Sequence, residues 1–106
     1  MRRCAMGVLA RRIRQARLAA GMSQVELALE AGIEPETASS RMSRYESGLR
    51  IPDPELVERM AAVLSRPPGW FYEPNEQLAE LLLTAWRLRP ADRRRVMALA
   101  EELVVR

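Results

Sequence analysis

Apolar residues recur every three or four positions along most of the chain, which is the period of amphipathic α-helices. No stretch alternates with the two-residue period of a strand. The sequence therefore predicts an all-α chain. The expected helices cover residues 8–20, 24 to 30 or 31, and 35–46, and three more begin at Pro54, Asn75 and Pro90.

Helix start and stop signals punctuate this pattern. Gly21 is expected to end the first helix. Ser23, with Glu26 three residues later, forms the signature of a capping box for the second helix. Gly32 ends that helix, and Asp53 is expected to cap the fourth. The first three helices are therefore short and joined by tight turns.

The helical period also assigns a buried side to each helix. In the third helix, Ala38, Met42 and Tyr45 face inward, and hydroxyls and arginines face outward. In the first helix, Arg12 is expected on the outside. Other residues expected to face inward in the first four helices are Leu9, Ile13, Ala16, Val25, Leu27, Ala28, Ala31, Leu56, Val57, Met60, Ala61 and Leu64.

A boundary is expected at Glu73-Pro74-Asn75, which divides the chain into a domain over residues 8–73 and a helical segment over residues 75–106. The aromatic run Trp70-Phe71-Tyr72 closes the first part. Packing in the core or an interface is favoured for it over stacking on single-stranded bases. The second part carries its own apolar stripe, formed by Leu78, Leu81, Leu82, Leu88, Val96, Leu99 and Leu103.

Charge is unevenly distributed along the 106 residues, whose net charge is +3. Residues 1–50 contain nine Arg and five Glu, a balance of +4, whereas residues 51–106 contain eight Arg and nine acidic residues, a balance of −1. Every basic residue is Arg, which suits bidentate contacts to phosphate and guanine. A GC-rich genome is the favoured explanation for the missing Lys.

Composition excludes several classes of protein. The single Cys4 rules out an internal disulfide, and the absence of His removes the usual zinc sites and histidine acid–base chemistry. Without a phosphate-binding loop either, no enzyme constellation is present, and no cofactor or metal is expected. The N-terminus lacks a signal-peptide pattern and no apolar run could span a membrane, so we expect a cytoplasmic protein.

Residues Leu9 to Tyr72 resemble the phage-repressor/Cro-like (XRE-type) helix-turn-helix regulators. The motifs that carry the resemblance are Arg17, Gly21-x-Ser23-Gln24, Leu27-Ala28, Gly32-Ile33, Arg44-Tyr45-Glu46-x-Gly48, and Pro52. The resemblance implies a five-helix lambda-repressor-like fold with a C-terminal helical extension. It also implies that Arg17 and Glu46 form a structural pair, and that the third helix is the recognition helix.

One departure from the family pattern concerns that helix. Gly32 and Tyr45 are thirteen positions apart, about four more than is usual in the family, and four residues make about one helical turn. We therefore expect the recognition helix to be one turn longer at its N-terminal end. The residues expected to contact DNA are Gln24, Thr37, Ser39, Ser40, Arg41, Ser43, Arg44, Ser47 and Arg50.

The sequence favours a sequence-specific DNA-binding transcriptional regulator, a repressor acting as a homodimer on an inverted-repeat operator in double-stranded DNA. The C-terminal stripe is the expected dimer contact, and we expect its two helices to pack against each other and against a second subunit near a two-fold axis. The alternative is an antitoxin that uses residues 75–106 to hold a toxin and also represses its own operon. For the outer face of the third helix, the alternative is a solvated surface without a ligand.

Overall fold

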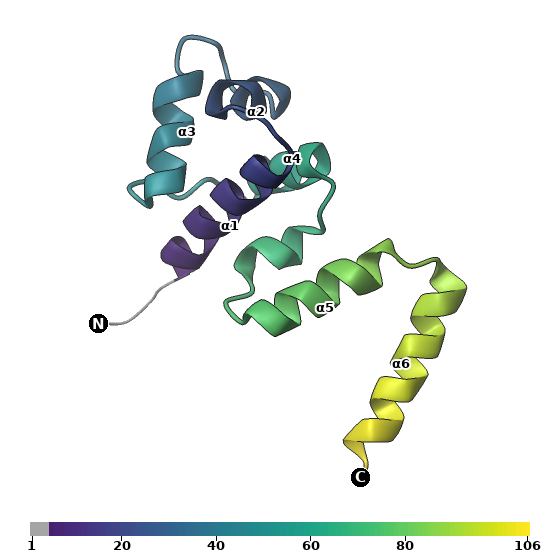
Figure 1. Ribbon diagram of the computed structural model, residues 1–106. Coiled ribbons are helices and arrows are strands. Elements are labelled where there is room, and N and C mark those ends of the chain that lie inside the picture. Colours follow the sequence, from purple (N-terminus) through teal and green to yellow (C-terminus); the bar gives the residue numbers. More distant parts are fainter. Residues whose placement is uncertain (1–4) are drawn as a thin grey trace.

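The computed structural model describes residues 5–106, so Arg2, Arg3 and Cys4 lie outside the described part. Within it the chain is all-α, as predicted, and has no strand (Figure 1). The elements are α1 (Ala5–Ala19), α2 (Gln24–Glu30), α3 (Ala38–Ser47), α4 (Pro54–Leu64), the 3₁₀-helix η1 (Pro68–Tyr72), α5 (Glu76–Arg87) and α6 (Pro90–Val104).

Side-chain caps begin the helices where the sequence predicted them. The Ser23 hydroxyl accepts from the backbone N–H of Glu26, and the Glu26 carboxylate accepts from the N–H of Ser23, which completes the capping box of α2. The Asp53 carboxylate likewise accepts from the N–H of Leu56 at the start of α4. Each such cap stabilises its helix by about 1 kcal/mol.

The first four helices and η1 form one body around a single core, to which α5 adds two buried side chains. Ile13, Leu27 and Met42, from α1, α2 and α3, are completely buried. Trp70 and Phe71 close the core from below, with their rings edge to face at 5.0 Å. Core packing is therefore the role of these two aromatic residues, and Tyr72 remains exposed.

Arg12 joins this body to the C-terminal helices, and here the prediction of an outward side chain was wrong. Arg12 is completely buried, and its guanidinium lies 5.0 Å from the centre of the Trp70 ring. Its Nε and Nη2 atoms donate to the carbonyl oxygen of Glu73 at 3.2 and 2.8 Å, and Nη1 pairs with the Glu76 carboxylate at 3.1 Å. Arg11 also pairs with Glu76. These contacts tie α1 to the first turn of α5.

The ion pairs of Arg11 and Arg12 with Glu76 also determine which side of α5 is buried. Glu76, Ala79 and Leu83 are spaced three and four residues apart and so lie on one face. Ala79 and Leu83 are the two buried residues of α5. The larger stripe of Leu78, Leu81 and Leu82, expected to form the dimer contact, is exposed in the single chain. The arginine contacts fix the rotation of the helix that leaves this stripe outward.

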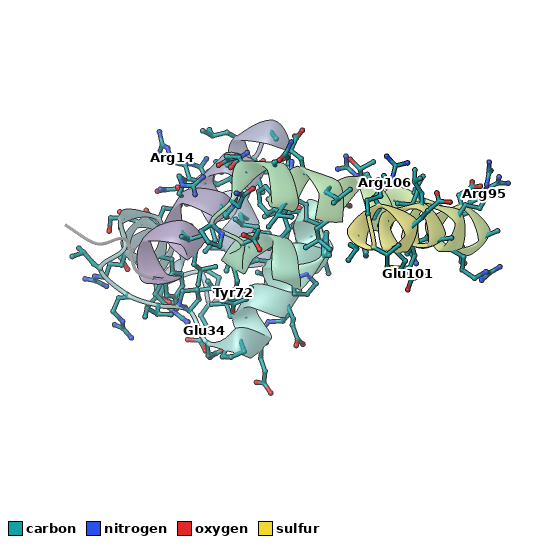
Figure 2. All side chains as sticks on the ribbon, turned by 90° about the horizontal axis from the view of Figure 1, so that it is seen from below. Arg14, Glu34, Tyr72, Arg95, Glu101 and Arg106 are labelled. Atoms are coloured by element: carbon teal, nitrogen blue, oxygen red, sulfur yellow. The ribbon has the colours of Figure 1, made fainter. Side chains whose placement is uncertain are left out.

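The last helix stands apart from the rest of the molecule. None of the residues of α6, all of which the structure describes, is buried. The helix meets α5 at the turn between them and then runs away from the body, as Figures 1 and 2 both show. The expectation that the apolar stripes of α5 and α6 pack against each other was therefore wrong.

Candidate nucleic-acid interface

The connection from α2 to α3 holds the extra residues that set this chain apart from the family pattern. Gly32 adopts a left-handed φ of 92°, and the N–H of Ile33 returns to the carbonyl of Ala28 at 2.9 Å, which ends α2. Residues 34–37 then form turns, and α3 begins at Ala38. The prediction of a recognition helix lengthened from Pro35 was wrong. Around Pro35 the backbone hydrogen bonds join residues three positions apart, as from the N–H of Thr37 to the carbonyl of Glu34 at 3.1 Å. The extra residues therefore lie in the turn before α3 and do not lengthen the helix.

The inner face of α3 is as predicted. Ala38, Met42 and Tyr45 are all buried in the core. Arg41, one turn before Tyr45, donates to the phenol oxygen of Tyr45 at 3.1 and 2.6 Å and lies 5.6 Å from the centre of its ring. Arg41 thus supports the helix through Tyr45, and the residue as a whole is half-buried.

The outer face of α3 is polar and open to solvent. Three side-chain hydroxyls donate hydrogen bonds to the backbone carbonyl three residues earlier. Thr37 donates to Glu34, Ser40 to Thr37, and Ser47 to Arg44. Such bonds use the hydroxyl proton and leave the oxygen lone pairs able to accept. The exposed predicted residues on and next to this face are Thr37, Ser39, Ser40, Ser43, Arg44, Ser47 and Arg50.

Arg44 and Arg50 supply the positive charge on this side. Both are exposed, and within residues 5–106 neither side chain takes part in a hydrogen bond or an ion pair. The opposite end of α3 is acidic, because Glu34 and Glu36 lie exposed in the preceding turn. The face therefore has unequal ends, with two unengaged guanidinium groups towards the C-terminal end and two carboxylates before its N-terminal end.

A buried carboxylate holds α3 in place. Glu46 is almost fully buried, and its two oxygens accept from Arg17 Nε at 2.6 Å and Nη2 at 3.0 Å. The same carboxylate accepts from the side-chain amide of Gln24 at 3.1 Å. Arg17 also donates to the carbonyl of Met22, and hydrogen bonding to Glu46 raises the pKa of Arg17. The pair that the family resemblance implied is thus present, with Gln24 as a third member.

Sequence reasoning missed Arg14 as a candidate on this surface. Arg14 precedes Arg17 by three residues on α1, and its Nη1 lies 3.9 Å from Glu46 Oε1. Its side chain is 60% exposed and can reach outward (Figure 2). It lies beside the group of Arg17, Gln24 and Glu46 that holds α3 in place, the bracing cluster. The signal was available, because Arg14 lies one helical turn before Arg17 and the family resemblance already placed Arg17 beside Glu46.

The fold and this surface define a helix-turn-helix protein. A helix-turn-helix family model, HTH_3, matches residues 13–71, which is more than half of the chain. The chain belongs to this XRE-type helix-turn-helix family. Its class is therefore that of the DNA-binding helix-turn-helix regulators.

A solved structure extends the likeness beyond that domain. The crystal structure of the transcriptional regulator BswR is similar, with a TM-score of 0.83 and 33% sequence identity. The match covers 91% of this chain and 95% of the other. The similarity therefore includes most of the C-terminal helices as well as the helix-turn-helix part. No curated protein matches the sequence significantly.

Two other kinds of site are not found in the described part of the chain. Residues 5–106 contain no cluster of acidic, histidine or cysteine side chains that could hold a metal ion. None of the helices found there has the length and apolar character needed to cross a bilayer.

Proposed function

We propose that this protein is a sequence-specific, dimeric transcriptional regulator that represses by binding an inverted-repeat operator. The observation that carries the proposal is the outer face of α3, where hydroxyls and the unengaged Arg44 lie opposite a buried face. A helix of this kind fits the major groove of B-DNA, where each base pair presents its own pattern of donors and acceptors.

Each group on this face has a chemical role in the proposed complex. Arg44 reads guanine, because a guanidinium can donate to N7 and O6 together. Ser39, Ser40 and Ser43 bond to base edges or phosphates. The remaining contacts, to the DNA backbone, come from Gln24, Thr37, Arg41, Ser47 and Arg50. Glu36 fits only where it accepts from a cytosine amino group or points to solvent, since a phosphate would repel it.

The bracing cluster supports the same assignment. Glu46 fixes α3 against α1 and α2 through Arg17 and Gln24. A recognition helix must be held within a fraction of an ångström for its contacts to discriminate between bases. Gln24, at the first turn of α2, can offer a phosphate its backbone N–H while its side-chain amide remains on Glu46.

The dimer claim rests on the C-terminal helices. One helix-turn-helix unit offers little surface for tight and specific binding, and two-fold pairing lets two recognition helices meet successive turns of the groove. Residues 8–73 would then read DNA and residues 75–106 would join the subunits. The apolar side chains left open on α5 and α6 support this division, because a patch of this kind marks an interaction surface.

The same exposed residues favour a second candidate function, that of an antitoxin. In that case the open faces of α5 and α6 hold a different protein, and DNA binding serves autoregulation. Purification of the tagged chain from its own host discriminates between the two. A stoichiometric second protein supports the antitoxin, and a homodimer alone supports the regulator.

An arginine substitution tests the DNA-reading face. Arg44→Ala should weaken binding to duplexes selected from a random pool by about 1–3 kcal/mol and relax the preference at one base pair. Arg94→Ala, an equally exposed arginine on α6, is the matched control and should keep the parent's affinity for those duplexes. If the folded Arg44→Ala variant binds like the parent, the assigned face is wrong.

A further inference from the structure

The turn between α5 and α6 is built to hold α6 away from the body. Arg93, in the first turn of α6, donates through Nε to the carbonyl of Ala85 at 2.8 Å and through Nη2 to those of Trp86 and Leu88 at 2.8 and 3.0 Å. These carbonyls lie at the C-terminal end of α5, where helix carbonyls lack the regular intrahelical partner, and the Ala85 carbonyl also accepts from the N–H of Leu88 at 3.2 Å. One guanidinium therefore caps α5 and fixes the direction in which α6 leaves it.

The helix held in this way carries a narrow apolar seam. Val96, Leu99 and Leu103 follow the alternating spacing of three and four residues that places side chains along one line of a helix. They are 39%, 54% and 48% exposed, respectively. An isolated helix of 15 residues is marginal in water, so a projecting α6 needs a partner along this seam.

The charges beside the seam indicate which partner fits. The N-terminal half of α6 contains Asp92, Arg93, Arg94 and Arg95, a net charge of +2, and the C-terminal half contains Glu101 and Glu102, a net charge of −2. A second copy aligned in parallel would place arginine beside arginine. A second copy aligned antiparallel places the basic half of each helix beside the acidic half of the other.

The heptad spacing gives the register of such a pair. When Val96 of one helix opposes Leu99 of an antiparallel second copy, Arg95 of the first helix and Glu102 of the second lie next to each other beside the seam. By symmetry the contact occurs twice. Arg94 and Glu101 then lie on the side of each helix that faces away from the partner. In the single chain Arg95 pairs only within its own helix, with Asp92 at 3.3 Å, and is 84% exposed.

We propose that α6 pairs antiparallel with α6 of a second copy of this chain, with Arg95 of each helix beside Glu102 of the other. This inference rests on the proposed function, for which it supplies the dimer contact and its register. Since α3 and α6 lie on opposite sides of the molecule in Figure 1, the pairing leaves both recognition helices open to DNA.

Charge reversal in the full-length chain tests the register. Sedimentation equilibrium should show a dimer for the parent, and Arg95→Glu and Glu102→Arg should each raise its dissociation constant by about tenfold or more, because each reversal makes two contacts repulsive. The double variant should return most of the parent's affinity. Arg94→Glu and Glu101→Arg make the same charge changes on the outward side and should leave dimerisation nearly unchanged. Circular dichroism shows whether each variant keeps its helices.

The outcomes separate this register from the function on which it rests. A dimeric parent whose Arg95→Glu variant is not rescued by Glu102→Arg refutes the antiparallel pairing, and DNA binding as a dimer then stands through another contact. Rescue of Arg95→Glu by Glu80→Arg instead would place α6 against α5 of the second copy. A parent that is monomeric at tens of micromolar refutes the pairing together with the proposed dimer.

Discussion

The helix-turn-helix body and helix α6 are both amphipathic, and yet only one of them is covered. In the body, the apolar sides of α1, α2, α3 and α4 meet in one core that Trp70 and Phe71 close. In α6, Val96, Leu99 and Leu103 follow the same helical spacing and are all exposed. The helical spacing of apolar residues thus identifies the apolar face of a helix but does not identify what covers that face.

The two regions also differ in how charge is used. The body buries two arginines, Arg12 and Arg17, and gives each of them several acceptors. In α6 the arginines are exposed, and the guanidinium of Arg93 donates its hydrogen bonds to backbone carbonyls of α5. Buried charge thus fixes the geometry of the body, whereas the charges of α6 lie at the surface. Substitutions in the body should therefore lower the stability of the fold, whereas substitutions in α6 should weaken self-association.

The largest effect on folding is expected at the buried pair. Arg17→Met leaves Glu46 buried without its main partner, which should cost about 3–5 kcal/mol of stability and lower Tm by more than about 10 °C. The ranking of DNA sequences by affinity should change little at a temperature where the variant is folded. Thermal unfolding followed by circular dichroism measures the first effect, and competition binding measures the second.

Arg14→Met is the matched control for this change, because Arg14 occupies the same helix and is mostly exposed. Its Tm should stay close to that of the parent. If Arg17→Met melts like the parent and loses its sequence preference, Arg17 contacts DNA and the structural assignment is wrong.

A pair of leucine truncations compares the two regions directly. Leu27→Ala empties part of the core and should cost about 2–5 kcal/mol of stability, with self-association unchanged in the folded fraction. Leu99→Ala should cost less than about 0.5 kcal/mol in the dilute single chain, where the side chain is 54% exposed. Instead it should weaken the dimer. Urea unfolding at low concentration and sedimentation at high concentration separate the two effects, and a loss of stability for Leu99→Ala equal to that of Leu27→Ala would refute the distinction.

The junction between the body and α5 should give the smallest effect, and one that depends on pH. Hydrogen bonds from Arg12 and Arg11 lower the pKa of Glu76 below 4.5. Because the folded pKa lies below the unfolded one, the contribution of Glu76 to stability is present above about pH 4.5 and is lost as pH falls through the folded value. Glu76→Gln should therefore be less stable than the parent at pH 7, and the difference should shrink in acid. Urea midpoints across pH 3–7 measure it, and a constant difference would contradict the assignment.

Much of the body could be predicted because its signals are local. The capping box of Ser23 and Glu26 and the inward set of Ala38, Met42 and Tyr45 depend only on residues within one or two helical turns. These predictions are confirmed. The family motif supplied the longer link from Arg17 to Glu46, which spacing alone does not provide.

The wrong predictions share a different cause. The burial of Arg12 depends on Glu73 and Glu76, more than sixty residues away. The same contacts fix the rotation of α5, and the hydrogen bonds from Arg93 direct α6 away from it, so the two apolar stripes do not pack against each other. The start of α3 was misplaced because the spacing of the extra residues fits a turn of helix as well as a loop, and the hydrogen bonds around Pro35 decide between them. Sequence periodicity contains none of these contacts.

Selection of bound duplexes from a random DNA pool by the full-length chain tests whether α3 reads DNA as part of a dimer. We expect an enriched inverted repeat whose half-site centres lie about 10–10.5 base pairs, roughly 34 Å, or a multiple of that spacing apart. Arg44→Ala should lose the preference at one position in each half-site. Enrichment of a single unpaired site would contradict the dimer, and a pool that shows no enriched sequence would contradict the claim that α3 reads DNA.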